Sequence, residues 1–282
     1  MSAARRGGWP PAPEPLPLPV TDNHTHIDVA KEVVEQPFTT DEWLARAAQV
    51  NVHRAVQIGC DLPGARWTAG IVSERPELLG GVALHPNEAP KLAQAGQLDS
   101  ALAEIAEIAQ VPRIRVIGET GMDTYRTGSE GQDAQRESFR AHIQMAKELD
   151  LALQIHDRDA HAEVLEILAQ DGAPERTIFH CFSGDAEMAK FCAAQGWYLS
   201  FAGTLTFKNA AGLRQALAVT PLNQIMVETD APFLTPHPHR GRPNSSYLLP
   251  HTVRTVAEIL DQPLENVCAA IESTTDAVYG PW

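Results

Sequence analysis

Short apolar runs rich in β-branched residues recur along this chain, and longer stretches with helical spacing of apolar residues lie between them. Each run has about 4–6 mostly apolar residues, the length and composition of a buried parallel strand. The predicted strands end near His24, Ile58, Leu84, Ile117, Ile155, Phe179, Phe201 and Val227. This alternation predicts repeated βα units and therefore a protein of the α/β class.

The stretches between these runs have the apolar spacing of amphipathic helices. Between residues 133 and 149, Phe139, Ile143 and Ala146 are spaced i, i+4 and i+7 and share one predicted helix face. Predicted helices cover residues 41–50, 98–110, 133–149, 159–170, 185–195, 209–218, 247–260 and 264–278. Eight alternating units in a chain of 282 residues favour a (β/α)8 barrel over a doubly wound open sheet, which stays the alternative.

The beginning of the chain lacks this alternation. Residues 1–19 are rich in proline, and no uninterrupted apolar segment follows Arg5 and Arg6, which disfavours a twin-arginine export signal. We therefore predict a disordered leader over residues 1–19 and one domain over residues 20–282. No run approaches the roughly 18 apolar residues of a membrane span, so we expect no membrane partner.

Composition and charge exclude only a few classes of function. The 44% apolar and 21% charged residues are close to the averages of soluble globular proteins. A formal net charge of −14 argues against a broad basic surface for nucleic acid, although a metal-lined pocket can still receive a phosphate. The four cysteines form no C-x-x-C pair, so we expect reduced thiols, a cytoplasmic location and, without a long exposed apolar stripe, a monomer.

Metal-competent side chains stand at the C-terminal ends of the predicted strands, the face where barrel enzymes build their sites. Imidazole and carboxylate groups bind Zn²⁺, Mn²⁺ or Fe²⁺, and six of them exceed what one ion usually takes while keeping a position open. We therefore predict two divalent ions, which could together activate a water and neutralise an oxyanion. The six residues are His24, His26, Glu119, His156, His180 and Asp230.

Three further residues are candidate substrate contacts. His85, in the His-Pro turn after the third predicted strand, is either a phosphate contact or a hydrogen-bonding support for the metal ligands. Arg158 lies just past a predicted ligand, and Arg240 lies in the loop of residues 236–244; both could hold a phosphate through paired N–H donors. We expect structural roles for the remaining candidates His53, His142, His161 and His251.

Seven motifs in register resemble the TatD-type metal-dependent deoxyribonucleases, which belong to the amidohydrolase-like metallo-barrels. The resemblance covers essentially everything after the leader, and its motifs are residues 22–28 (DNHTHID), 84–86 (LHP), 118–123 (GETGMD), 155–160 (IHDRDA), 180–184 (HCFSG), 227–232 (VETDAP) and 239–241 (HRG). Each motif alone is weak, whereas their common order is specific.

The resemblance implies roles for the six predicted ligands. His24 and His26 would hold the first metal together with Asp230, Glu119 would bridge, and His156 and His180 would hold the second. Asp230 would also accept a proton from the attacking water, so Asp230 and Glu119 are the predicted catalytic carboxylates. The cofactors would be two divalent metal ions, Zn²⁺, Mg²⁺ or Mn²⁺.

The implied activity is hydrolysis of DNA phosphodiester bonds, exonuclease-like and at single-stranded ends. An ester or amide hydrolase, such as an aminoacyl-tRNA deacylase, is the alternative, because the same activated water could serve either reaction. A non-catalytic partner protein is disfavoured, since all six ligands are present. Tyr125, Phe201 and Phe207 are candidate platforms for stacking bases, although barrel core or helix packing is the favoured interpretation of the two phenylalanines.

The chain departs from the family pattern at the rim of the predicted site. Asp157 follows a predicted metal ligand where a less charged residue is expected, and Ser245 and Ser246 stand where the family commonly continues Glu-Pro. The leader is a further departure. These differences bear on the choice of substrate rather than on the metal ligands.

Overall fold

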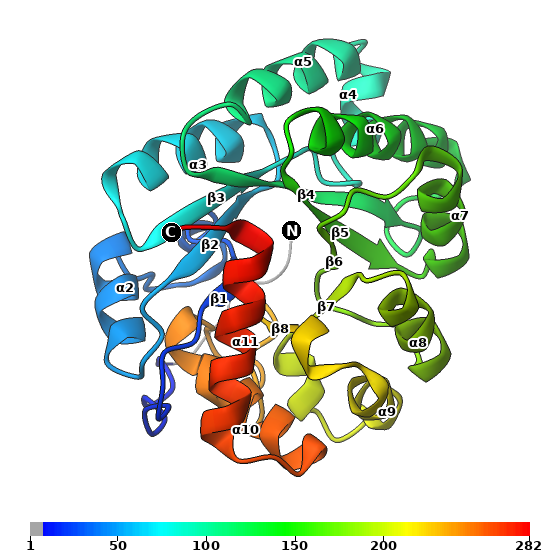
Figure 1. The fold of residues 1–282 in the computed structure, drawn as a ribbon. Helices are drawn as coiled ribbons and strands as arrows, with labels where there is room; N and C mark the ends of the chain where they lie inside the picture. The colour runs from blue at the N-terminus through cyan, green and yellow to red at the C-terminus, as the bar shows by residue number, and fades with distance from the viewer. Residues whose placement is uncertain (1–7) are drawn as a thin grey trace. The chain divides into compact units, whose positions relative to one another are not determined.

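Strands and helices alternate in a computed structural model that describes residues 8–282 (Figure 1). The strands are β1 (Asp22–Thr25), β2 (Ala55–Gly59), β3 (Leu78–Val82), β4 (Ile114–Asp123), β5 (Ala152–Arg158), β6 (Thr177–Phe179), β7 (Tyr198–Phe201) and β8 (Ile225–Val227). The α-helices are α1 (Ala30–Val33), α2 (Thr40–Ala48), α3 (Leu62–Glu74), α4 (Ala89–Gln94), α5 (Leu98–Ile108), α6 (Ser129–Glu148), α7 (His161–Asp171), α8 (Ala186–Ala194), α9 (Ala211–Val219), α10 (Leu249–Leu260) and α11 (Leu264–Tyr279). Short 3₁₀ helices η1 (Gly203–Thr206), η2 (Leu222–Gln224) and η3 (Ser246–Leu248) complete the elements.

The strands follow one another in sequence order, from β1 to β8, in a single sheet. Neighbouring strands pair in parallel, as between Asp22 of β1 and Ala55 of β2. A further parallel bridge joins Thr25 to Ala231, just beyond β8, so the first and last strands are also neighbours. This is the topology of a (β/α)8 barrel, which confirms the predicted fold class and excludes a doubly wound open sheet.

The chain divides into two compact units. The first contains the described residues up to Gln57 together with Gly184–Pro281, and the second contains Ile58–Ser183 with Trp282. Each has its own buried apolar side chains, including Trp43 and Tyr247 in the first unit and Phe139 in the second. The single domain that we expected over residues 20–282 stays a prediction.

Capping residues explain where several helices begin. The Thr39 hydroxyl accepts the Glu42 N–H at 3.2 Å, and the Glu42 carboxylate accepts the Thr39 N–H at 2.9 Å, which forms a capping box before α2. Asp185 accepts the N–H groups of Glu187 and Met188 at the start of α8. Within the described residues, no helix is long and apolar enough to cross a membrane.

The two central strands β4 and β5 are longer than the apolar pattern predicts. Thr120–Asp123 pairs with Ile155–Arg158 beyond the expected strand ends, after a register shift in β4. Gly121 has a φ of 137°, and a side chain there would collide with the carbonyl oxygen of His156, so only glycine allows this close approach. Charged residues hid the extension from the sequence pattern, and Glu119 and His156 consequently lie within strands rather than after them.

The expected leader requires a correction. Residues 1–7 lie outside the described residues, whereas residues 8–19 pack against other parts of the first unit. The Trp9 ring stacks on Phe38 with centroids 3.8 Å apart, and the Tyr247 hydroxyl donates to the Pro10 carbonyl at 2.7 Å. Leu16 is buried, and its N–H donates to Val50 at 3.2 Å. Proline restricts φ and removes a donor, so a proline-rich segment can be held by aromatic contacts with few backbone bonds. We call residues 8–16 the N-terminal strap.

Candidate functional site

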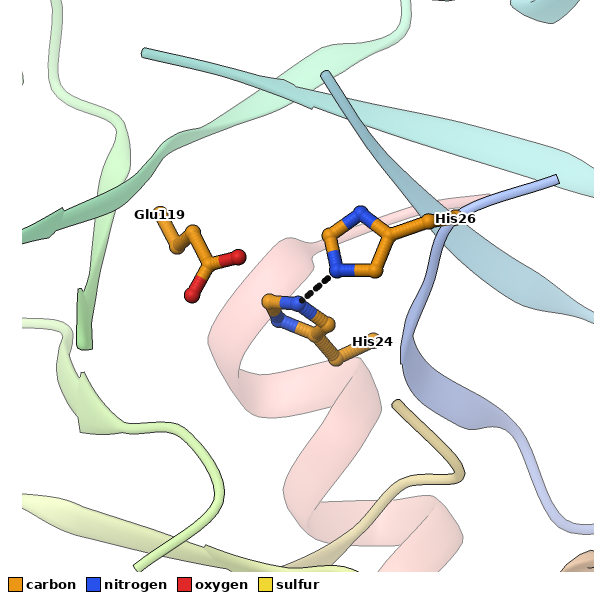
Figure 2. Close-up of side chains that lie close together, drawn as sticks. All are labelled: His24, His26 and Glu119. Carbon is orange, nitrogen blue, oxygen red and sulfur yellow. Dashed lines mark hydrogen bonds between the residues drawn. The ribbon is translucent and has the colours of Figure 1, made fainter. Parts of the chain in front are cut away.

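Three predicted ligands come together in the first unit. This group, the His24 cluster, consists of His24, His26 and Asp230. The two imidazole Nε2 atoms lie 3.0 Å apart (Figure 2), and Asp230 Oδ1 lies 3.3 Å from that of His26 and 3.8 Å from that of His24. Both histidines are buried. Residues at i and i+2 of an extended segment point to the same side, which is how the sequence brings these rings together.

A buried carboxylate supports the His24 cluster from behind. Asp22 accepts the Thr229 N–H at 2.8 Å and the hydroxyls of Thr229 and Ser246 at 2.6 Å each. Burial raises the pKa of Asp22 to about 6, although these donors act in the opposite direction. The bonds tie β1 to the turn that carries Asp230, whose N–H also donates to the His24 carbonyl at 3.0 Å.

Asp22 was not predicted to have a role, although a charged residue inside a predicted buried strand is a signal that the sequence offers. Ser246, one of the departures from the family pattern, proves to be one of its donors and also accepts the Trp43 indole N–H at 2.9 Å. Asp230 itself has a φ of 50°, a left-handed conformation that aspartate tolerates better than most residues.

The second unit brings together the other predicted ligands. This group, the Glu119 cluster, places three imidazoles around Glu119 Oε2: His180 Nε2 at 2.7 Å, His156 Nδ1 at 3.0 Å and His85 Nε2 at 3.9 Å. The Cys60 thiol donates to the other oxygen of Glu119 at 3.2 Å. The sequence analysis did not single out Cys60, which lies directly after β2.

The carboxylate of Glu119 is charged in this setting. Burial alone would raise the pKa of Glu119, but the imidazoles of His180 and His85 and hydrogen bonds with His156 and His180 outweigh it and hold the pKa well below its usual value. Figure 2 also draws this residue, whose side chain is almost fully buried. A buried anion surrounded by imidazole nitrogens is a donor set suited to a divalent cation.

The hydrogen bonds of His85 identify its tautomer. Its Nδ1 atom accepts the N–H of Asn87 at 3.0 Å, so the neutral ring carries its proton on Nε2. Burial lowers the pKa of His85 to about 3, and the ring is therefore neutral. A protonated Nε2 facing Glu119 favours a hydrogen-bond donor over a metal ligand, although the side chains of His85, Glu119 and His156 lie close enough to share an ion.

Asp123 is a functional candidate that the sequence analysis missed. Its Oδ2 atom lies 3.3 Å from His156 Nε2 and accepts the Asn87 side-chain amide at 2.9 Å. Burial would raise the pKa of Asp123, but the hydrogen bonds with His156, Asn87 and the Arg126 N–H hold it well below its usual value. His156 therefore lies between two carboxylates: burial would lower the pKa of its imidazole, but the hydrogen bonds of Nε2 with Asp123 and of Nδ1 with Glu119 raise it.

The two predicted phosphate-binding arginines lie against aromatic rings. The Arg158 guanidinium lies 3.9 Å from the ring centroid of Tyr125 in the second unit. The Arg240 guanidinium lies 3.9 Å from that of Phe207 in the first unit. The structure therefore does not join either arginine to a predicted metal ligand by a hydrogen bond within the described residues.

The remaining histidines lie outside both clusters. His142 is buried and bonds to the Thr120 hydroxyl at 2.9 Å, and His53 is exposed and lies 3.2 Å from Asn51 Oδ1. His161 Nδ1 lies 2.7 Å from Asp157 Oδ2, so the unexpected charge at position 157 faces an imidazole. The His251 ring packs on that of His239 with centroids 5.4 Å apart.

The chain is similar to known proteins over nearly all of its length. A family model described as TatD related DNase matches residues 21–280. A metal-dependent hydrolase of Mycobacterium tuberculosis, named TatD, is 40% identical over 265 residues, covering 93% of this chain and 98% of that protein. YabD of Bacillus subtilis, also named a metal-dependent hydrolase, is 34% identical over 251 residues, 88% of this chain and 94% of that protein.

A solved structure has the same fold. The YJJV protein of Escherichia coli K12, described as a TatD homologue, superposes with a TM-score of 0.82 at 23% identity, covering 93% of this chain and 98% of that chain. The family match spans both clusters and begins one residue before β1. The chain therefore belongs to the TatD family of metal-dependent hydrolases.

Proposed function

We propose that this protein hydrolyses phosphodiester bonds of DNA and takes single-stranded ends as its substrate. The convergence of three imidazoles on the Glu119 carboxylate carries the proposal, together with membership of a family described as TatD related DNase. A recessed cluster of buried ligands suits the end of a flexible strand better than the interior of a duplex, because an unpaired terminal nucleotide can enter it.

The proposed cofactors are two divalent metal ions. His24, His26 and Asp230 would bind one ion, His156 and His180 the other, and Glu119 would be shared. The donor sets fit: the Nε2 atoms of His24 and His26 meet at 3.0 Å, and the buried Glu119 anion lies 2.7 Å from an imidazole nitrogen. When bound, such ions lower the pKa of water and neutralise charge on a phosphoryl oxygen.

The protein's own groups would divide the remaining work. Asp230 Oδ1 would take the proton of the attacking water, as a hydrogen-bonded carboxylate can. The Nε2–H of His85 would donate to a phosphate oxygen, and the neutral ring can do so because its Nδ1 atom is already satisfied by Asn87. Arg158 and Arg240 would hold phosphate oxygens through their N–H donors.

The test is cleavage of end-labelled single-stranded and duplex DNA by metal-supplemented protein, beside a chelator control and Asp230→Asn. A ladder from single strands that disappears in both controls is the expected result. The same acid-to-amide change at Asp133, whose side chain is 97% exposed, is the matched control and should cleave like the wild type.

Metal content measured on the same samples makes a negative result informative. No cleavage by protein that carries two metal equivalents would overturn the DNA proposal and favour an ester or amide substrate. Cleavage that persists in metal-free protein would contradict the metal-dependent mechanism itself.

A further inference from the structure

The contacts of Arg158 differ from those of most arginines on this protein. Arg54, Arg66 and Arg140 each pair with a carboxylate. Within the described residues, the guanidinium of Arg158 makes no hydrogen bond or ion pair and lies instead over the ring of Tyr125 at 3.9 Å. Its N–H donors therefore stay available to an anion while the aromatic ring fixes the plane of the group.

The two aspartates beside Arg158 do not neutralise it. Asp157 lies 2.7 Å from His161 Nδ1 and, among the described residues, forms no ion pair with Arg158. Asp159 is exposed and has a φ of 56°, and its carbonyl accepts the Thr124 hydroxyl at 2.7 Å. The chain thus holds a cation between two acidic residues without pairing it to either.

Tyr125 is unusually open for a large aromatic residue. Its side chain is 65% exposed, the largest exposed fraction among the exposed large apolar residues of the described chain. The other two candidate stacking residues are less suited: Phe201 is fully buried, and Arg240 lies over the partly buried ring of Phe207. Arg158 lies over one face of Tyr125, and the high exposure leaves ring surface for a planar ligand.

The extension of β4 and β5 sets the distance from this pair to the Glu119 cluster. His156 and Arg158 are at i and i+2 of β5, so their side chains leave the strand on the same side, about 7 Å apart. Asp123, which contacts His156, is the register partner of Arg158 and stands two residues before Tyr125. The Thr124 N–H donates to the Arg158 carbonyl at 3.1 Å and holds the turn that presents Tyr125.

We propose that Tyr125 and Arg158 form a nucleotide subsite, in which an unpaired base stacks on the tyrosine ring and Arg158 binds a phosphate next to the cleaved bond. The inference rests on the proposed function and specifies its substrate as a single strand with an intact base beside the cleavage position. Stacking on an aromatic side chain requires an unpaired base but tolerates any base, so the subsite would select single strands without reading their sequence.

The experiment compares two otherwise identical labelled single strands, one complete and one with an abasic residue in the nucleotide next to the cleaved bond. Stacking contributes about 1–3 kcal/mol per base, so wild-type protein should favour the complete strand by about 5- to 150-fold in kcat/KM, mainly through KM. Tyr125→Ala should reduce this ratio to about one, whereas Tyr125→Phe, which keeps the ring, should preserve it.

Two further variants separate the parts of the subsite. Arg158→Gln should weaken cleavage of both strands by a similar factor, because it removes a phosphate contact and not the stacking ring. Phe191→Ala, which removes an exposed aromatic residue from the first unit, is the matched control and should keep the wild-type ratio. Thermal melting of each variant checks that it is folded, as expected for side chains at the surface.

The outcomes distinguish the subsite from the nuclease activity. If wild-type protein cleaves both strands equally, or if Tyr125→Ala keeps the preference, the subsite is refuted and the nuclease proposal stands. If metal-loaded wild-type protein cleaves neither strand, the proposed function fails and the subsite fails with it.

Discussion

The His24 cluster and the Glu119 cluster hold their imidazoles in different ways. In the first, two buried rings meet nitrogen to nitrogen at 3.0 Å, and the supporting carboxylate of Asp22 bonds to the backbone and hydroxyls behind them. In the second, the central carboxylate of Glu119 contacts the imidazoles directly, and Asp123 bonds to the ring of His156, a predicted ligand. In the His24 cluster, hydrogen bonds hold the backbone segments that carry the imidazoles. In the Glu119 cluster, hydrogen bonds hold the imidazole rings themselves.

This difference predicts that equivalent substitutions act differently without metal. Removing a carboxylate from the Glu119 cluster leaves buried imidazoles without their acceptor, which affects folding as well as chemistry. Removing Asp230 from the His24 cluster takes away a partly exposed group at the end of a turn.

The largest effects are expected at the two proposed catalytic carboxylates, Glu119 and Asp230. Glu119→Gln and Asp230→Asn should each lower turnover of single-stranded DNA by about 10²- to 10⁴-fold. In metal-free protein Glu119→Gln should lower the free energy of unfolding by roughly 1–3 kcal/mol and Asp230→Asn by less, because Glu119 has two imidazole nitrogens within 3.0 Å whereas the nearest one to Asp230 is 3.3 Å away. Equal melting temperatures for the two metal-free variants would erase the proposed contrast between the clusters.

His142 should make the second unit sensitive to acid. Burial lowers the pKa of His142 from 6.5 to about 4, so between these values the unfolded chain binds a proton that the folded chain excludes. The contribution of the neutral His142 to the free energy of unfolding is fully present above pH 6.5. It is lost as the pH drops through this window, by roughly 3 kcal/mol at pH 4. We expect denaturant titrations to show that the free energy of unfolding falls less between pH 7 and pH 4 in His142→Gln than in the wild type, by roughly 3 kcal/mol.

The exposed His53 supplies the control for this measurement. His53→Gln should keep the acid sensitivity of the wild-type protein, since this side chain is exposed and lies outside the buried core. The same acid loss in wild type and His142→Gln would show that other groups cause it.

Asp123→Asn tests support through a side chain. The change removes the anion that bonds to His156 Nε2 and should weaken metal affinity by about 10- to 100-fold, as loss of such supports typically does. Competition with a fluorescent metal chelator measures the affinity without any need for substrate. Unchanged affinity would mean that Glu119 and the strand alone orient His156.

Ser246→Ala tests the hydrogen bonds that hold the backbone behind the His24 cluster. The expected effect is smaller than that of Asp123→Asn and concerns the free energy of unfolding instead of metal affinity. The variant removes one donor to Asp22 and the acceptor of the Trp43 indole, which should cost about 1–2 kcal/mol of unfolding free energy. Metal affinity should stay within a factor of a few of wild type. A loss of affinity as large as that of Asp123→Asn would remove the distinction between the two kinds of support.

The apolar pattern predicted the fold because the strands are largely buried and therefore appear in the sequence as short apolar runs. The predicted ends at Phe179, Phe201 and Val227 coincide with those of the structure. The predicted ends at Ile117 and Ile155 fall short, because polar residues continue β4 and β5 past the apolar runs. The apolar pattern does not reveal the C-terminal part of a strand when that part carries polar residues of the candidate site instead of core residues.

The candidate ligands were predictable because metal binding needs particular side chains at strand ends, and the sequence shows both. The residues that support the candidate ligands could not be predicted in this way. Asp22 and Asp123 form hydrogen bonds with partners that only the tertiary structure brings near. The packed conformation of residues 8–19 was not predicted for a related reason. The proline-rich composition is a property of the segment alone, whereas the rings of Phe38 and Tyr247 that hold it lie elsewhere in the chain.

The N-terminal strap lies outside the family match and yet touches the loop of residues 236–244. The Arg242 guanidinium of that loop donates to the carbonyl of Trp9 at 2.7 Å and also bonds to that of Gly8. A substitution in the strap can therefore reshape this loop at Arg242, two residues from Arg240, with every predicted metal ligand left intact.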